Sequence, residues 1–284
     1  MPELPEVEVL VRYLEPLLIN RVIRSVQIHR PKSIRPTALR QMSVKLVGAR
    51  FNSVTRRAKY LLFEMKSPGR APAFTLLGHL GMTGRMYLQS KKKQLPKHTA
   101  VVLELGRHNF VFEDTRYFGR LTLDMESLDA LGPEPLGNEF DGRILRDALS
   151  RSTQVIKVKL LDQSVVAGIG NIYASEILFH AGISPRKAAK RLTHKQCDNL
   201  AMSIHEILSE AIQCGSTVPL NFSGTNKRDG HFYYGRTEST ANYSEERMLV
   251  YGREGDPCSC CGKPVRRIIQ SGRSTFFCCV CQRD

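Results

Sequence analysis

The chain has 284 residues, 42% of them hydrophobic, which is enough for two domains with their own cores. No apolar run approaches the roughly 20 residues that cross a membrane, and the first residues lack the basic and hydrophobic regions of a signal peptide. The formal net charge is +15, from 42 Lys and Arg against 27 Asp and Glu, and so large a positive charge favours a polyanionic partner. We therefore expect a soluble, cytoplasmic protein that binds nucleic acid and no membrane.

The first predicted element is a helix over residues 4–19. Apolar residues recur at helical spacing between Leu4 and Leu18. Pro5 suits the first turn of a helix, and Pro16 is expected to end or kink the helix near its far end.

The residues before this helix raise a chemical question. Pro2 stands directly behind Met1 and is followed by Glu3. One interpretation is structural, because a proline and nearby carboxylates suit the start of a helix. The other is catalytic: if Met1 is removed, Pro2 becomes a free secondary amine beside a carboxylic acid.

The rest of the chain divides into regions that differ in residue composition and in the pattern of apolar residues. Residues 22–125 contain short Val-, Leu- and Phe-rich segments separated by turn residues, which predicts an antiparallel β-sandwich or barrel. We expect an N-terminal domain over residues 1–130 and a linker over 131–140, where two prolines and two glycines cluster. A helical domain is expected over 141–249, and its segment 220–248 is predicted as a long loop. A cysteine-rich module is expected over 250–284.

The cysteines predict a metal site. Six of the eight lie in the last 27 positions, whereas Cys197 and Cys214 are isolated. The spacing C-x2-C-x16-C-x2-C supplies four thiolates for one structural Zn²⁺ from Cys258, Cys261, Cys278 and Cys281. Cys260 and Cys279 are additional, and they leave the choice of ligands ambiguous.

The residues between the two cysteine pairs predict a β-hairpin. Two short apolar segments flank Ser271 and Gly272, and Arg273 follows at the tip. Arg266 and Arg267 add positive charge, which favours contact with phosphate. Such zinc-bound hairpins also bind proteins, so the module alone does not identify the partner.

A glycine-rich turn precedes a strongly predicted helix in the helical domain. Gly168 and Gly170 allow backbone N–H groups to converge on an anion, and Asn171 is expected to cap the helix. This arrangement holds a DNA phosphate without reading sequence. The alternative is a capped helix after a tight turn, with no ligand.

Taken together, several segments resemble the bacterial formamidopyrimidine-DNA glycosylase family, within the superfamily that also contains endonuclease VIII. They are PELPEVE, RRAKYLLFE, HLGMTG, DTRYFG, LGPEPL, LDQSVVAGIGNIYASEILF and the terminal cysteine region. The resemblance spans nearly the whole chain and implies an α+β fold. This fold has an N-terminal β-sandwich with a terminal helix, a helical domain with a helix–two-turn–helix motif, and a zinc-finger β-hairpin.

The resemblance also implies an activity. The family removes oxidised purines from DNA and then nicks the strand, through a Schiff base on the N-terminal proline. Carried onto this chain, Pro2 is the nucleophile and Glu3 the proton donor, with Glu6 in support. Lys59 assists at the lesion and in β-elimination, and Arg273 contacts phosphate and assists δ-elimination.

Further residues match family positions that contact DNA. They are His98, Arg116 and Asn171, with Arg151 and Lys157 as weaker phosphate candidates. Met82, Arg116 and Phe118 resemble the wedge that fills the space of the flipped base. Met82 and Phe118 could instead be core residues, although the flanking glycines favour exposed loop tips.

Two departures from the family pattern concern specificity. Tyr117 occupies a position where the family often has a second basic residue. The expected lesion-recognition loop, residues 220–248, looks longer than its family counterpart.

The expected partner is double-stranded DNA with oxidised bases or abasic sites, bound by a monomer. The alternatives are an endonuclease VIII-like glycosylase for oxidised pyrimidines and a non-catalytic zinc protein that binds damaged DNA. The presence of Pro2, Glu3 and Lys59 together disfavours the non-catalytic alternative.

Overall fold

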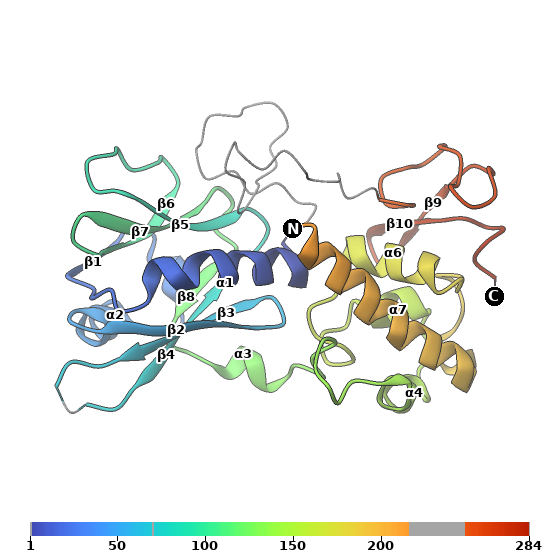
Figure 1. Cartoon of the computed structure of the whole chain (residues 1–284), viewed down its shortest axis with the longest axis horizontal. Helices are drawn as coiled ribbons and strands as arrows, with labels where there is room; N and C mark the ends of the chain where they lie inside the picture. The colour runs from blue at the N-terminus through green and yellow to red at the C-terminus, as the bar shows by residue number, and fades with distance from the viewer. Residues whose placement is uncertain (1, 70, 216–247, 284) are drawn as a thin grey trace. The chain divides into compact units, whose positions relative to one another are not determined.

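The computed structural model describes residues 2–69, 71–215 and 248–283 (Figure 1). These residues form two compact units. The first comprises described residues up to 129, and the second comprises residues 130–215 and 248–283. The predicted loop 220–248 lies outside the described residues except for Met248. No helix in the described ranges is long and apolar enough to cross a membrane.

Helix α1 (Leu4–Leu18) opens the first unit in agreement with the predicted spacing. Its apolar side chains at Leu4, Val7, Leu10 and Leu14 are fully buried. Pro16 lies inside the helix near its end, and two further residues continue beyond it. The helix packs against strand β2, so its apolar stripe contributes to the core of this unit.

The first unit contains two four-stranded antiparallel sheets, in the orders β1-β6-β7-β5 and β2-β3-β4-β8, in its described part. The strands are β1 (Ser25–Ile28), β2 (Arg50–Arg57), β3 (Tyr60–Lys66), β4 (Phe74–His79), β5 (Gly84–Ser90), β6 (Thr99–Glu104), β7 (His108–Asp114) and β8 (Arg120–Thr122). Phe51 and Phe63 of one sheet meet Phe110 of the other with ring centroids 5.6–6.3 Å apart. The two sheets therefore share one aromatic core, and the predicted β-sandwich is confirmed.

Short helices complete the first unit. They are η1 (Pro31–Ile34), α2 (Leu39–Leu46) and α3 (Glu126–Asp129). Met42 and Leu46 bury the inner side of α2 in the same core. By contrast, no residue of α3 is buried.

The second unit is helical and ends in a β-hairpin. Its elements are α4 (Gly142–Leu149), α5 (Ile156–Leu160), α6 (Asn171–His180), η2 (Ala189–Arg191), α7 (His194–Gln213), β9 (Arg266–Gln270) and β10 (Arg273–Phe277). Every residue of α6 from Tyr173 to Phe179 is buried, so this helix is central to its unit. A reciprocal capping box between Thr193 and Gln196 fixes the start of α7. The helices and the hairpin confirm the predicted α+β class.

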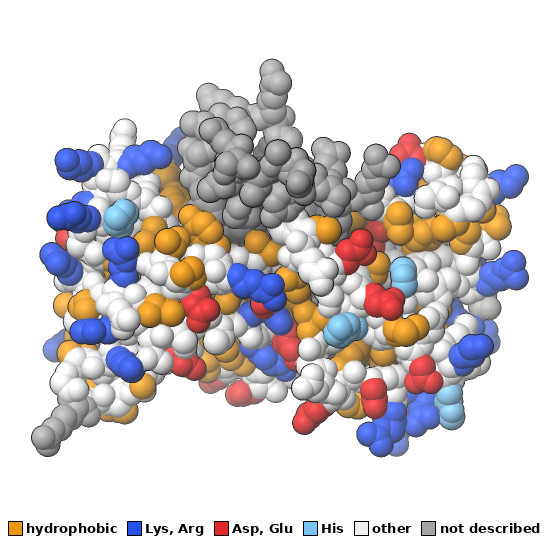
Figure 2. Space-filling model, viewed as in Figure 1, with side chains coloured by type: hydrophobic (Ala, Val, Ile, Leu, Met, Phe, Trp, Pro, Cys, Tyr) orange, Lys and Arg blue, Asp and Glu red, His pale blue; other side chains and the backbone are white. Residues whose placement is uncertain are grey.

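Charged side chains are dispersed over the visible surface of both units. In the view of Figure 2, Lys and Arg are interspersed with Asp and Glu. A net charge of +15 does not therefore produce one exclusively basic face in this view.

Candidate functional site

The start of α1 brings the N-terminal residues into a buried, hydrogen-bonded arrangement. Pro2 is buried, and Glu3 and Glu6 are 1% and 0% exposed. The Glu3 N–H donates to Glu6 Oε2 at 2.7 Å, and the Glu3 carboxylate accepts from the backbone N–H of Glu6. Both carboxylates lie at the positive end of the helix dipole, which stabilises negative charge. The residue that directly follows Pro2 is thus held by the first turn of α1.

Lys59 lies in the two-residue turn between β2 and β3, since Arg57 pairs with Tyr60 across the hairpin. Its side chain is largely buried, at 9% exposed. Ala58 adopts a positive φ of 52°, which an alanine disfavours. The backbone here is therefore held in place by surrounding contacts.

Arg56 connects this turn to α1. Its guanidinium donates to the Glu8 carboxylate at 2.8 Å and to the Ala58 carbonyl at 3.1 Å. Burial alone would raise the pKa of Glu8, but hydrogen bonds from Arg56 and Arg12 hold it below its usual value. The helix that follows Pro2 and Glu3 is thereby linked to the turn that carries Lys59.

His79, which the sequence analysis did not single out, lies at the end of β4. It pairs with Tyr60 of β3 and Arg120 of β8, and its ring centroid is 4.7 Å from that of Tyr60. Its Nδ1 accepts from the Gly81 N–H at 3.2 Å, so this nitrogen carries no proton. Burial, together with the charges of Lys59 and Arg120, lowers its pKa from 6.5 to about 4 despite the opposing effect of Asp114.

This pKa shift predicts a pH-dependent stability. Because the neutral imidazole is favoured in the folded state, its stabilisation is complete above pH 6.5 and is lost as the pH falls towards 4. At about pH 5 the loss should be about 2 kcal/mol. His79→Asn retains an acceptor for Gly81 but cannot titrate, so its stability should fall less between about pH 7 and pH 5.

Urea unfolding at the two pH values measures the difference. His29→Asn, at an exposed position in the same unit, is the matched control. An equal loss of stability in the parent and in His79→Asn would contradict the prediction that His79 causes the pH dependence.

Asp114 joins the two loops that carry the predicted wedge residues. Its fully buried carboxylate accepts from Thr83 Oγ1 at 2.6 Å, from the Arg116 N–H at 3.1 Å and from the Gly119 N–H at 2.8 Å. Thr83 belongs to the β4–β5 loop, and the other two donors belong to the β7–β8 loop. One buried side chain thus sets the conformation of both loops.

Gly81 allows the same loops to approach closely. Its φ is +63°, and a Cβ at this position would lie 2.6 Å from the Gly119 nitrogen. A larger residue would therefore force the loops apart.

The predicted wedge residues lie at the exposed tips of these loops. Met82 is 41% exposed and Phe118 is 49% exposed, so neither is a core residue. The Arg116 guanidinium carbon lies 5.0 Å from the centroid of the Phe118 ring. The three residues therefore lie on one pair of loops. Met82 and Phe118 are at exposed loop tips, as the flanking glycines indicated, and not in the core.

Because Met82 is exposed, we expect its truncation to affect base excision much more than folding stability. Met82→Ala should change the free energy of unfolding by less than about 0.5 kcal/mol, as is usual at exposed positions. Excision of a damaged base from duplex DNA should fall about tenfold or more, because apolar wedges offset an unstacking penalty of a few kcal/mol. Thermal melting and single-turnover excision measure the two effects.

Two methionines provide matched controls. Met202→Ala, at a position 55% exposed, should affect neither quantity. Met65→Ala, at a fully buried position, should lose about 2–5 kcal/mol of stability. If Met82→Ala resembles Met65→Ala, the wedge assignment is wrong.

His98 and Tyr117 form a pair beside the wedge loops. His98 Nδ1 and the Tyr117 hydroxyl are 3.2 Å apart. Tyr117 has a positive φ of 53°, between Arg116 and Phe118. The tyrosine that departs from the family pattern thus orients a predicted DNA contact.

In the second unit, Lys157 and Asn171 belong to one polar cluster. Lys157 is fully buried, and its Nζ donates to Asn171 Oδ1 at 3.1 Å, to Ser175 Oγ at 3.0 Å and to Thr275 Oγ1 at 3.4 Å. Asn171 Nδ2 in turn donates to the Ser274 carbonyl at 3.0 Å. The cluster therefore connects α5 and α6 to the hairpin beside Arg273.

Gly170, not Asn171, is the N-cap of α6, and its extended backbone leaves Asn171 as the first helical residue. The Asn171 side chain consequently bonds the hairpin rather than the helix end. Arg151 is exposed at the turn after α4, apart from this cluster in the chain.

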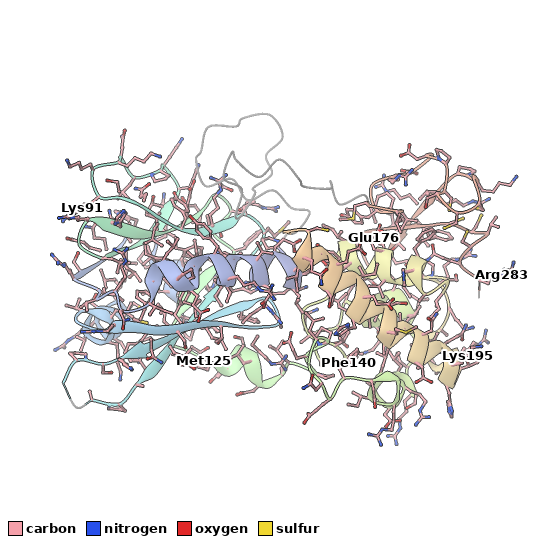
Figure 3. The ribbon with its side chains drawn as sticks, in the orientation of Figure 1. Lys91, Met125, Phe140, Glu176, Lys195 and Arg283 are labelled. Atoms are coloured by element: carbon pink, nitrogen blue, oxygen red, sulfur yellow. The ribbon has the colours of Figure 1, made fainter. Side chains whose placement is uncertain are left out.

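Glu176 is a second residue that the sequence analysis missed (Figure 3). It is 5% exposed and accepts from the backbone N–H groups of Leu249, Val250 and Tyr251 at 2.7–3.0 Å. Burial raises its pKa, although these three donors oppose the shift. Glu176 fastens the chain that leads into the cysteine module onto α6. The signal in the sequence that could have identified Glu176 was a carboxylate within a helical segment that is otherwise expected to be buried.

The structure confirms that the four predicted cysteines form one cluster. Their Sγ atoms all lie within 4.8 Å of one another, with Cys258 and Cys281 at 3.9 Å and Cys261 and Cys278 at 3.4 Å. Tetrahedral zinc at about 2.3 Å from each sulfur places sulfurs about 3.8 Å apart. The donor set and its spacing therefore fit such an ion.

The two remaining cysteines of the module are Cys260 and Cys279, and both are exposed. Gly262 adopts a φ of +71° just after the first pair, which allows its N–H to bond the Cys258 carbonyl at 2.9 Å. The ambiguity of the sequence is resolved in favour of the C-x2-C pairs.

Arg273 lies at the hairpin tip, as predicted. Ser271 and Gly272 have positive φ values of 46° and 71°, the conformation of a tight two-residue turn. Arg273 follows at the start of β10 and is exposed. The cysteine cluster and the turn together hold its backbone at a defined place.

Comparison with known proteins identifies relatives across the whole chain. A sequence model described as "Formamidopyrimidine-DNA glycosylase N-terminal domain" matches residues 1–121, and one described as "Formamidopyrimidine-DNA glycosylase H2TH domain" matches residues 131–221. The formamidopyrimidine-DNA glycosylase of Desulfitobacterium hafniense is 38% identical over 289 residues, covering 99% of this chain and 100% of the relative. That of Cereibacter sphaeroides is 40% identical over 301 residues, covering 100% of both chains.

Solved structures give the same result. A Lactococcus lactis Fpg mutant in complex with DNA that contains Fapy-dG has a TM-score of 0.84 and 33% identity, with 100% of each chain covered. A complex between the Lactococcus lactis Fpg and DNA that contains an abasic site has a TM-score of 0.85 and 32% identity, covering 99% of this chain and 100% of the other.

Proposed function

Because the chain belongs to the formamidopyrimidine-DNA glycosylase family, we propose that it is a DNA glycosylase of base excision repair that removes oxidised purines, and that it then cleaves the strand at the abasic site. The observation that carries the proposal is the buried start of α1, where Pro2 directly precedes Glu3 and the Glu3 N–H bonds the Glu6 carboxylate. The Fapy-dG and abasic-site complexes of the Lactococcus lactis relatives support this choice of substrate. The proposed enzyme acts as a cytoplasmic monomer on duplex DNA.

The proposed nucleophile is the nitrogen of Pro2 after removal of Met1. α-Amino groups have pKa values near 7.7–8.0 in model compounds, so a useful fraction is neutral at physiological pH. Its attack on C1′ breaks the bond to the base, which leaves with the electron pair and takes up a proton. Glu3 protonates the sugar ring oxygen, and ring opening leaves an iminium ion.

Strand cleavage follows from the same intermediate. The iminium ion withdraws electrons, so the 2′ proton becomes acidic and its removal expels the 3′ phosphate. A second elimination expels the 5′ phosphate. We assign assistance in the first elimination to Lys59, whose turn is linked to α1 by Arg56, and in the second to Arg273. Glu6 maintains the terminus by accepting from the Glu3 N–H.

The remaining assignments concern DNA binding. His98, Arg116, Asn171, Arg151 and Lys157 are proposed phosphate or backbone contacts. For Lys157 the proposed role acts through Asn171, because the lysine is fully buried and bonds the asparagine side chain. Met82, Arg116 and Phe118 are the proposed wedge.

The metal proposed for the cysteine cluster is one Zn²⁺, held by Cys258, Cys261, Cys278 and Cys281. When bound, it supplies structural stability and no chemistry at the lesion. The cluster packs with Phe179 of α6 and with Val250 and Val265, so the hairpin base is part of a small apolar core. The Asn171 side chain bonds the carbonyl of Ser274, the residue that follows Arg273.

Oxidised pyrimidines are a second candidate substrate class. A complex between the Lactococcus lactis Fpg and DNA that contains an oxidised pyrimidine is among the similar structures, with a TM-score of 0.84 and 32% identity.

Cleavage assays on matched duplexes test the proposal. Single-turnover excision of 8-oxoguanine should be faster than excision of an oxidised pyrimidine such as 5-hydroxycytosine. A reversed preference would favour the endonuclease VIII-like alternative. Binding without cleavage of any of these duplexes would favour a non-catalytic protein.

A further inference from the structure

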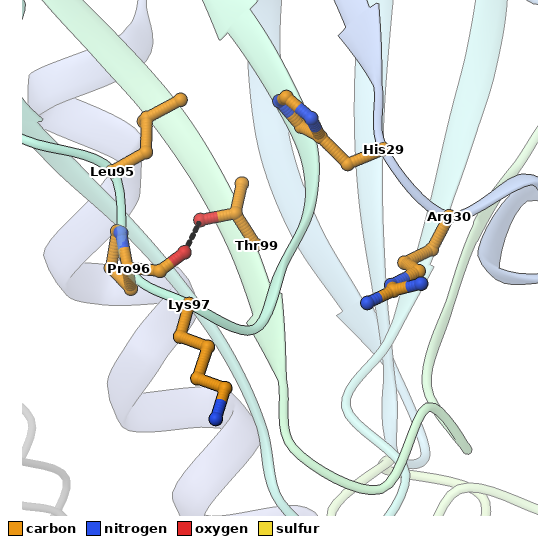
Figure 4. Close-up of a pocket in the computed structure, with 6 residues that line it drawn as sticks. All are labelled: His29, Arg30, Leu95, Pro96, Lys97 and Thr99. Carbon is orange, nitrogen blue, oxygen red and sulfur yellow. Dashed lines mark hydrogen bonds between the residues drawn. The ribbon is translucent and has the colours of Figure 1, made fainter.

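A hollow of about 310 Å³ lies in the first unit, between the end of β1 and the segment that precedes β6 (Figure 4). The residues that line it are His29, Arg30, Leu95, Pro96, Lys97 and Thr99. His29, Arg30 and Lys97 carry or can carry positive charge, and none of the six is acidic. The hollow is therefore suited to an anion, and the proposed reaction does not use it.

Main-chain hydrogen bonds fix both sides of the hollow. The N–H groups of His29 and Arg30 donate to the Ala100 carbonyl at 2.9 and 3.1 Å. On the other side, the Pro96 carbonyl accepts from Thr99 Oγ1 at 2.7 Å and from the Thr99 N–H at 3.1 Å (Figure 4). The backbone positions from which Arg30 and Lys97 extend are therefore well defined.

Arg30 is further oriented by an aromatic contact. Its guanidinium carbon lies 4.9 Å from the centroid of the Tyr117 ring, a favourable cation–π distance. The Tyr117 hydroxyl is 3.2 Å from His98 Nδ1. Tyr117 therefore connects the hollow to His98 and to the wedge loop that carries Arg116 and Phe118.

We propose that this hollow binds a phosphodiester group of the DNA backbone outside the lesion site, through Arg30 and Lys97. The inference rests on the proposed DNA-repair function. A guanidinium offers several planar N–H donors and an ammonium offers a compact charge, and both are suited to phosphate oxygens. Because the hollow adjoins His98 through Tyr117, it would extend the phosphate contacts beyond those proposed at the lesion. Such a contact contributes affinity but no base specificity.

The salt dependence of binding tests this subsite. Kd is measured at several salt concentrations for a duplex with an uncleavable abasic analogue and for an undamaged duplex. For the Arg30→Ala/Lys97→Ala double variant, the slope of log K against log salt should lose about 0.9 per phosphate contact removed. Affinity should fall by a similar factor for both duplexes, since the contact does not involve the lesion.

Two variants act as controls. Arg107→Ala removes one exposed charge from the same unit but not from the hollow, and its slope should stay close to that of the parent. Arg30→Lys keeps the charge in the hollow and should retain most of the slope. Thermal melting establishes that each variant is folded.

The outcomes separate the subsite from the proposed function. An unchanged slope in the double variant, with normal excision by the parent, would overturn the subsite. A loss of affinity confined to the damaged duplex would also overturn it. If the parent excises no damaged base while the slope difference persists, the subsite stands and the glycosylase proposal fails.

Discussion

Replacing Pro2 with glycine is expected to reduce cleavage of an abasic-site duplex by about 100-fold or more, because the primary amine of glycine lacks the ring that orients the proline nitrogen for attack. The duplex Kd should change by less than about threefold, since the proline nitrogen contributes to the reaction and not to phosphate binding. Pro2 is buried beside Glu3, whose N–H is held by Glu6. Single-turnover cleavage and equilibrium binding measure the two effects.

Two further measurements test whether the nitrogen of Pro2 is the nucleophile. Intact mass should show that the active protein lacks Met1, because retention of methionine would make the proline nitrogen an amide. Glu6→Gln is an informative comparison: it keeps an oxygen that accepts from the Glu3 N–H, so it should be far less damaging than Pro2→Gly. Full activity in a protein that retains Met1 would exclude the Pro2 mechanism.

Replacing Cys278 with serine should release the metal and disorder the hairpin that carries Arg273. Cys278 is fully buried, and its Sγ lies 3.4 Å from that of Cys261. Structural zinc contributes roughly 10–16 kcal/mol to small zinc modules, so loss of one ligand is a large perturbation. Duplex affinity should fall roughly tenfold or more, because the exposed cations of the hairpin are no longer held in place.

Cys279→Ser is the matched control, since it alters the neighbouring exposed thiol. It should retain one zinc per chain and parental affinity, as should Cys260→Ser. Metal content is measured by elemental analysis of the folded proteins. Loss of zinc from Cys279→Ser, with zinc retained in Cys278→Ser, would contradict the assigned ligand set.

Local patterns predicted much of the fold. The apolar spacing from Leu4 to Leu18 gave the correct helix because its period matches the buried face of α1. Short apolar segments between turn residues predicted the sandwich, since alternation and turns are also local signals. The cysteine spacing predicted the cluster of four thiols, although only the folded chain distinguishes the buried Cys278 from the exposed Cys279.

Residues whose roles depend on distant partners were not predicted. The donors to Glu176 lie 73–75 positions further along the chain. Thr83 reaches Asp114 across 31 positions, and Lys157 reaches Thr275 across 118. No local periodicity encodes such pairs, so neither the loop-fixing role of Asp114 nor the burial of Lys157 could be derived from the sequence. His79 was missed for the same reason, because its environment comes from β3, β8 and the β4–β5 loop.

The central claim is that the N-terminal amine of Pro2 forms the covalent bond to DNA. Borohydride trapping on a duplex with one 8-oxoguanine tests it most directly, since hydride addition to the iminium carbon leaves a stable amine. Peptide mapping by mass spectrometry then locates the crosslink. We predict that the DNA is attached to the nitrogen of Pro2 in a protein that lacks Met1. A crosslink at Lys59, or the absence of any crosslink from a protein that binds and cleaves the duplex, would contradict the account.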